Sequence, residues 1–245
     1  MNKFMFFSIC ILILCVLGLT ADQDFDHDVI QTSKGELKMT FIAHGTLMFE
    51  FNELVIHIDP VGRYADYSRL PKADLVLITH HHGDHLDPKV LNTISDQDTE
   101  LVLTEKCKEQ YKNGMVMNNG DKKVVKGIKI KAIPAYNIQH MRSGNTPFHP
   151  KGEGNGYILE LGSKKVYVAG DTENTPEMKA LTDIDIAFLP MNIPYTMTPE
   201  MAADAARSFM PKILYPYHYG NTDPQKLVDL LKDMKEIEVR VRDLR

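Results

Sequence analysis

The chain has 245 residues and a formal net charge of −5, and 43% of its residues are hydrophobic. This length is sufficient for a single domain with a substantial buried core. Its basic residues form only short pairs such as Lys122-Lys123, so nucleic acid is not expected as a partner.

The first residues are typical of an export signal. Residues 4–19 form an apolar stretch behind Lys3, and Thr20-Ala21 precedes a polar, acidic segment. A basic start, a short apolar core and a small residue at the end indicate a secretory signal peptide, too short for a comfortable membrane span. We therefore expect residues 1–21 to be a signal peptide cleaved after Ala21. The mature chain is then periplasmic or secreted, with no stable membrane span; a lipoprotein anchor at Cys15 is the alternative.

Residues 22–36 are predicted to be a polar lead-in with a disordered His27, and residues 37–245 to form one domain. Apolar runs separated by turn residues predict strands, and proline just after a capping residue predicts the start of a helix. The expected strands are 37–43, 47–51, 54–58, 75–79, 101–104, 124–133, 157–161, 166–169, 184–189 and 213–217. The expected helices are 88–95, 176–181, 199–209 and 224–234. Two sheets packed face to face between outer helices account for this order.

The most distinctive motif is His80-His81-His82-Gly83-Asp84-His85, which directly follows the apolar run at residues 75–79. Its glycine allows a tight turn, so that several side chains can meet at one point. Imidazoles with a carboxylate are typical of a divalent metal site that activates water. His81 lies between two candidate ligands and is expected to point elsewhere. An exposed histidine-rich tract is the alternative, but this cluster follows a strand that has the composition of a core strand.

Three further apolar runs end in a potential ligand. The runs at residues 54–58, 165–170 and 212–217 are followed directly by Asp59, Asp171 and His218, respectively. His57, inside the first of these runs, is expected to be structural. Ligands gathered from strand ends at one edge of a sheet give a rigid site whose loops remain free to choose a substrate.

These residues resemble the metallo-β-lactamase superfamily. His80-x-His82-x-Asp84-His85 is similar to its His-x-His-x-Asp-His signature, Asp171 stands in a Gly-Asp-Thr motif, and His218 ends a metal-bearing strand. Residues 134–137, 148–152 and 195–198 look like its metal-dependent hydrolase branch, near the lactonase-like and phosphodiesterase-like members. The resemblance covers roughly residues 37–240. It implies an α/β (α+β) fold, the four-layer αββα sandwich, and a hydrolytic activity.

The resemblance also implies a dinuclear metal centre. The expected ligands are His80, His82 and His149 for the first ion, Asp84, His85 and His218 for the second, and Asp171 as a bridge. Two divalent ions roughly 3.5–4 Å apart can share and activate one water for hydrolysis. Zn²⁺ is the expected metal, with Mn²⁺ or Fe²⁺ as alternatives.

The third histidine of the first ion has more than one candidate. His149 lies twenty-two residues before Asp171 and is followed closely by Gly152, as in many members of the resembled family. His140 is the second candidate. Other members use an earlier position, which is occupied here by Asn137. We expect His149 to be the ligand.

Further residues are candidates for roles around the metal ions. Asp84 is expected to orient the attacking water, and Tyr195 to donate a hydrogen bond to developing negative charge. Asp59 either holds a ligand histidine from behind or caps a strand end. His44 either contacts the substrate or a ligand, or occupies a structural turn.

We therefore expect a hydrolase that cleaves an ester, lactone or phosphodiester bond in a small-molecule substrate. A β-lactamase, a redox diiron protein and a non-catalytic metal-binding module are the alternatives. No sequence feature indicates the oligomeric state.

Overall fold

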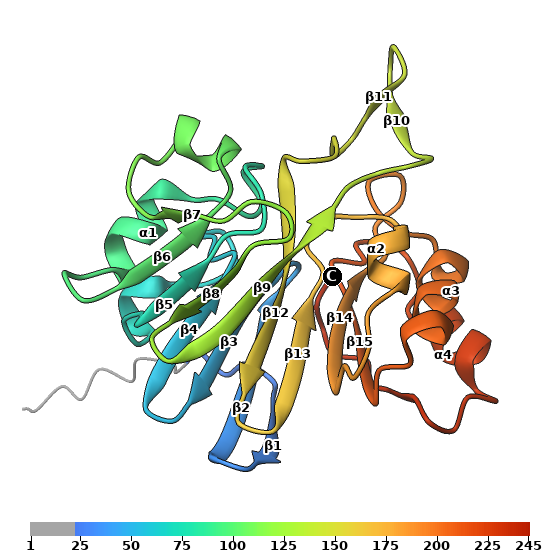
Figure 1. Cartoon of the computed structure of the whole chain (residues 1–245), viewed down its shortest axis with the longest axis horizontal. Helices are drawn as coiled ribbons and strands as arrows, with labels where there is room; N and C mark the ends of the chain where they lie inside the picture. The colour runs from blue at the N-terminus through green and yellow to red at the C-terminus, as the bar shows by residue number, and fades with distance from the viewer. Residues whose placement is uncertain (1–22) are drawn as a thin grey trace, which may run out of the picture.

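The computed structural model describes residues 23–245, so the expected signal peptide lies outside the described residues. Within these residues the chain forms two seven-stranded sheets and a separate two-stranded hairpin. The two large sheets pack face to face, and helices lie outside them (Figure 1). This arrangement confirms the predicted αββα sandwich.

The first sheet contains the N-terminal strands in sequence order. They are β1 (His27–Thr32), β2 (Gly35–Ala43), β3 (Thr46–Phe51), β4 (Leu54–Ile58), β5 (Leu75–Leu77), β6 (Glu100–Leu103) and β7 (Met115–Val116). The second sheet, in spatial order, contains β16 (Glu238–Val239), β15 (Ile213–Tyr217), β14 (Ile186–Pro190), β13 (Lys164–Val168), β12 (Gly154–Leu161), β9 (Ile128–Ala135) and β8 (Lys122–Val125). β10 (Met141–Arg142) and β11 (Thr146–Pro147) form the hairpin. Each sheet contains three consecutive parallel strands, β4–β5–β6 in the first and β13–β14–β15 in the second.

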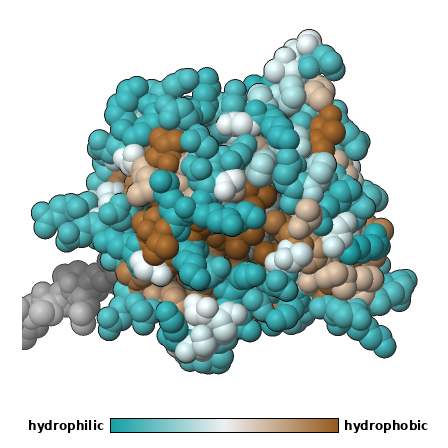
Figure 2. Space-filling view, in the orientation of Figure 1, coloured by the Kyte–Doolittle hydropathy of each residue, from teal (hydrophilic) through white to brown (hydrophobic). Residues whose placement is uncertain are grey.

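The helices cover the outer faces of the sheets. They are α1 (Pro88–Ile94), α2 (Pro176–Lys179), α3 (Pro199–Phe209) and α4 (Gln225–Leu231), with 3₁₀ turns η1 (Tyr67–Arg69) and η2 (Lys106–Glu109). No helix within residues 23–245 combines the length and the apolarity needed to cross a bilayer. Figure 2 shows apolar residues gathered near the middle of the visible face, bordered by hydrophilic residues.

β5 shows why an uninterrupted apolar run forms a strand here. Leu75 and Leu77 belong to the core between the sheets, whereas Val76 and Ile78 pack in the cluster that includes residues of α1. Side chains alternate between faces along a strand, so a strand covered on both sides must be apolar throughout. The run therefore ends where the chain leaves the core and enters the histidine motif.

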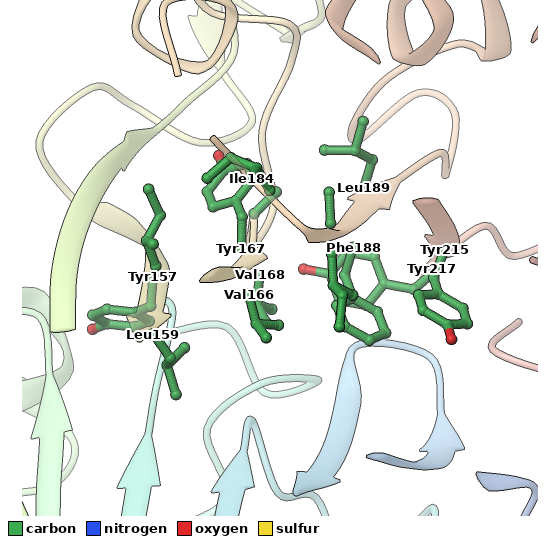
Figure 3. Close-up of a cluster of buried hydrophobic side chains, with 14 of the residues drawn as sticks. Tyr157, Leu159, Val166, Tyr167, Val168, Ile184, Phe188, Leu189, Tyr215 and Tyr217 are labelled. Atoms are coloured by element: carbon green, nitrogen blue, oxygen red, sulfur yellow. The ribbon is translucent and has the colours of Figure 1, made fainter. Parts of the chain in front are cut away.

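Aromatic rings fill the core where the two sheets meet. Phe188 of β14 stacks on Tyr215 of β15, with 4.9 Å between ring centroids (Figure 3). Phe41 of β2, in the opposite sheet, lies 5.1 Å from the Tyr215 ring. These contacts pack β14 and β15 against β2 of the first sheet.

Two expectations about strands are wrong. Residues 124–133 were expected to be one strand, but Lys126 (φ 49°) and Gly127 (φ 77°) turn the chain back, so β8 pairs with β9 as a hairpin. His27 was expected to be disordered, yet it begins β1, which pairs antiparallel with β2. Polar side chains are compatible with this position because β1 is an edge strand.

A partly buried contact fixes β1 to the end of the chain. Asp28 accepts hydrogen bonds from Arg242 Nη2 at 2.7 and 2.9 Å, from Arg240 Nη1 at 3.1 Å, and from the Tyr215 hydroxyl. Burial tends to raise the pKa of Asp28, but these hydrogen bonds outweigh it and hold the pKa below its ordinary value.

We expect Asp28→Asn to lower the free energy of unfolding by about 1–3 kcal/mol at neutral pH, since charge-assisted hydrogen bonds are lost. A carboxyl whose pKa is depressed on folding stabilises above the unfolded value of about 3.9. The difference from wild type should therefore shrink as pH falls through that value toward the folded pKa. Urea unfolding of both proteins at several pH values from 7 to 3 measures this difference in the free energy of unfolding. Asp24→Asn, at an exposed position, is the control, and equal stability of both variants at pH 7 would contradict the prediction.

Candidate metal centre

The candidate metal-binding side chains follow strands of both sheets. Asp59 follows β4 and His80 follows β5 in the first sheet, while Asp171 follows β13 and His218 follows β15 in the second. All four strands are members of parallel pairs, and their carboxyl ends meet at one edge of the sandwich. This is the arrangement in which α/β folds usually place a site.

The first group consists of His80, His82 and His149, whose ring nitrogens lie within 4.8 Å of one another. His80 Nε2 lies 3.2 Å from His82 Nδ1. One carboxylate oxygen of Asp171, Oδ2, lies 3.3 Å from His149 Nε2 and 3.9 Å from His80 Nε2. Three imidazoles and one carboxylate oxygen therefore surround a single point.

The second group consists of Asp84, His85 and His218, joined by His44. The other oxygen of Asp171, Oδ1, lies 3.4 Å from both His85 Nε2 and His218 Nε2. Asp84 Oδ2 lies 3.8 Å from His218 Nε2 and 3.4 Å from His44 Nε2. Asp171 thus presents one oxygen to each group.

The buried atoms of this centre fit a cation. Among residues 23–245, Asp171 Oδ1, His85 Nε2 and His218 Nε2 are buried without a hydrogen-bond partner. Leaving such atoms unpaired costs about 1–3 kcal/mol each. Nitrogen and carboxylate donors facing one another are the ligand set of zinc and related divalent ions, so the residues present suit a metal.

Electrostatics supports the same assignment. Burial lowers the pKa of His80 well below its ordinary value, so this ring is neutral, as a metal ligand must be. Burial also opposes charge on His85, but Asp171 and Asp59 outweigh it and raise the pKa of His85 to about 9. Burial tends to raise the pKa of Asp171, but His218 and His85 hold it well below its ordinary value. A cation bound between these groups therefore replaces a proton on His85.

Asp59 holds His85 from behind. It is fully buried, and its Oδ2 accepts a hydrogen bond from His85 Nδ1 at 2.7 Å. The same carboxylate accepts from the Thr79 backbone N–H at 2.7 Å and from the Thr79 hydroxyl at 2.6 Å. With Nδ1 engaged, His85 is left with Nε2 facing Asp171, which is how supporting carboxylates orient metal-ligating histidines.

Asn137 supports His149 in the same way. Its Oδ1 accepts from the His149 backbone N–H at 2.9 Å and from His149 Nδ1 at 2.8 Å, leaving Nε2 toward Asp171. Its Nδ2 donates to Glu173 Oε1 at 3.1 Å and to the Tyr195 carbonyl at 2.9 Å, which fixes the orientation of the amide. Asn137 therefore orients His149, a candidate ligand, and both polar atoms of its own amide are engaged in these supporting contacts.

Sequence reasoning missed Glu173. Its carboxylate accepts backbone N–H groups of Ile138, Gln139 and His140, each at 2.7 Å. Burial tends to raise its pKa, but the His140 N–H and the Asn137 amide outweigh it and lower the pKa. His140 Nδ1 also lies 2.8 Å from Glu173 Oε1, and His140 belongs to none of the candidate metal groups in the described chain. Its position two residues after Asp171 was the one feature of the sequence that could have indicated a role for Glu173 at the site.

A pocket of about 420 Å³ lies beside the candidate metal-binding side chains. Tyr195 lines it, as do Arg142, Phe148 and Asn192. His44 touches the second group directly, with its ring centroid 3.6 Å from that of His218.

Two further histidines, His81 and His57, belong to no candidate metal group in the described chain. His81 is partly exposed, as expected of a loop residue. His57 is buried, with Nε2 3.1 Å from the Pro71 carbonyl, in keeping with a structural role.

Comparison with known proteins gives consistent relatives. The family profile described as the beta-lactamase superfamily domain matches residues 38–218. A UPF0173 metal-dependent hydrolase of Pelotomaculum thermopropionicum is 29% identical over 222 residues, covering 84% of this chain and 96% of the relative. A crystal structure of a proposed metal-dependent hydrolase from Parabacteroides distasonis has 51% identity and a TM-score of 0.86, covering 91% of this chain and 100% of that one. Igni18, a metallo hydrolase from Ignicoccus hospitalis, has 25% identity and a TM-score of 0.69, covering 84% and 95%.

We expect His149→Ala to lower metal occupancy and His140→Ala to leave it near wild type, because His149 turns a ring nitrogen toward Asp171 whereas His140 turns one toward Glu173. Elemental analysis of dialysed protein checks this, with circular dichroism to confirm folding. The reverse outcome would reassign the third histidine of the first group to His140.

Proposed function

Because the chain belongs to the beta-lactamase superfamily, we propose that it is a metal-dependent hydrolase with a dinuclear centre that cleaves an ester, lactone or phosphodiester bond. The observation that carries the dinuclear proposal is the position of Asp171. Its two oxygens face two separate groups of ligands, at 3.3 Å from His149 Nε2 and 3.4 Å from His218 Nε2. A centre for one tetrahedral ion needs only four donors, and these groups supply more.

Two divalent ions, when bound, lower the pKa of water and polarise a carbonyl or phosphoryl oxygen. The chain contributes the geometry around them. The Asp84 side chain is 32% exposed and lines the pocket, so its carboxylate can accept a hydrogen bond from an attacking water. His44, 3.4 Å from Asp84 Oδ2, holds that carboxylate in place.

Tyr195 also lines the pocket of the proposed reaction site. Its backbone carbonyl is fixed by Asn137, and its ring packs edge-on against Phe148 at 5.1 Å. A phenol lining this pocket can donate a hydrogen bond to the oxygen on which negative charge develops. A purely structural metal site would be closed to solvent, whereas this one opens into a pocket large enough for a small molecule.

The dinuclear proposal predicts about two divalent ions per chain at saturation. Titration with Zn²⁺ or Mn²⁺ followed by elemental analysis measures the number. His81→Ala is the matched control, because His81 lies in the same hexapeptide but in none of the ligand groups, and it should bind as many ions as wild type. Saturation of the wild-type protein at a single ion would exclude the dinuclear centre.

Asp84→Asn preserves the size of the side chain but weakens the acceptor that orients water. We expect kcat and kcat/KM to fall together by about 10² or more, as when an interaction of the transition state is removed. The assay is a panel containing a phosphodiester, a lactone, a neutral ester and a β-lactam, with metal content measured in parallel. Asp98→Asn, at an exposed loop position, should behave as wild type. Undiminished turnover by a fully metallated Asp84→Asn protein would falsify this role.

A further inference from the structure

We infer that Arg142 forms an anion-binding subsite in the pocket, so that the substrate carries a negatively charged oxyanion group next to an apolar substituent. The inference rests on the proposed hydrolase function and narrows its substrate class. It begins from the β10–β11 hairpin, which projects from the body of the molecule at the upper right of Figure 1.

The hairpin holds the Arg142 guanidinium at the mouth of the metal centre. The guanidinium carbon lies 5.6 Å from the centre of the Phe148 ring, and Nη2 lies 3.2 Å from the Phe148 carbonyl oxygen. The same Nη2 lies 3.2 Å from His82 Nε2. The side chain is therefore folded back over the site, although it belongs to an exposed hairpin residue.

Most of the donors of this guanidinium remain available. Both polar contacts use Nη2, and within residues 23–245 neither Nη1 nor Nε has a hydrogen-bond partner. Arg142 also has no carboxylate partner in the described chain, whereas Arg240, Arg242 and Arg245 each pair with one. A guanidinium is always charged and only donates, so its free N–H groups suit the oxygens of a phosphoryl or carboxylate group.

Apolar side chains border the same pocket. Phe148 and Tyr195 line it together with Arg142, and Tyr195 is 46% exposed. Large apolar side chains exposed beside a polar centre mark a surface that a ligand covers. A cation with apolar neighbours therefore matches an anionic substrate that also has an apolar group.

Binding can be measured without turnover. Phenylphosphonate combines an oxyanion with an aromatic ring and contains no ester bond, and its affinity for the metal-loaded protein is obtained by calorimetry. We expect Arg142→Gln to weaken its binding about 10- to 100-fold with unchanged metal content, as for loss of charge-assisted hydrogen bonds. Arg142→Lys should weaken it less. Arg63→Gln is the matched control: Arg63 also lies over an aromatic ring, Tyr64, but does not line this pocket.

Kinetics identifies which anion is recognised. Mono-p-nitrophenyl glutarate and p-nitrophenyl butyrate are similar esters with and without a carboxylate, and bis(p-nitrophenyl) phosphate carries its charge on the reacting group. We expect Arg142→Gln to raise KM for an anionic substrate and to reduce its kcat/KM at least about tenfold more than that of the neutral ester. An effect on the glutarate indicates a carboxylate beside the scissile bond, and an effect on the phosphodiester indicates the phosphoryl group itself.

The outcomes separate this inference from the proposed hydrolysis. Binding of phenylphosphonate that depends on Arg142, without hydrolysis of any substrate by wild type, supports the subsite and counts against the hydrolase. Equal binding by wild type and Arg142→Gln, or no binding by wild type, overturns the subsite. Equal losses on neutral and anionic esters also overturn it, because they indicate that Arg142 only supports the hairpin.

Discussion

The carboxylate of Asp59 is the contact on which the geometry of the metal centre depends. It joins the end of β4 to the histidine motif after β5 through Thr79 and His85. Because it is fully buried, losing any of these donors would leave a charge without compensation. It therefore fixes the start of the motif and the direction of His85, and Asp171 and His218 are placed relative to His85 from the other sheet.

The centre also connects the two sheets. His80 and His85 come from the first sheet, and Asp171 and His218 from the second. Their unpaired, buried atoms make this edge costly in the absence of a cation, although the aromatic core below it is complete. Binding of metal and cohesion of the two sheets are thus linked, because an ion that binds only the folded arrangement stabilises it by mass action.

The sequence predicts best what is set locally. Central strands such as β4 and β15 are found with their exact bounds because an apolar run buried on both faces has few alternatives. The same holds for α3, where Thr198 caps a helix that begins at Pro199. The edge strand β1 escapes this reasoning because it is polar, and besides its pairing with β2 it is held by arginines more than two hundred residues away.

The site shows the same division. Candidate ligands at strand ends can be predicted once the strands are predicted, and the structure brings these residues together. Glu173 and Arg142 could not be found this way. Glu173 binds the loop at residues 136–149 and Arg142 belongs to it, and only tertiary contacts determine the path of this loop. Asn137 shows how this matters: it occupies a position where a ligand was considered, and its amide instead orients His149.

The contact between Asp28 and Arg242 has a consequence for the order in which the molecule is assembled. The two residues are separated by 214 positions, so the first strand of the domain cannot find its charged partner until nearly the whole chain has been synthesised. A ribosome delivers the N-terminal end first, so β1 can pair with β2 early, whereas its contact with Arg242 must wait until the last residues emerge. The carboxylate of Asp28 therefore lacks its arginine partners until the C-terminal residues are available, although β1 already has β2 as a neighbour.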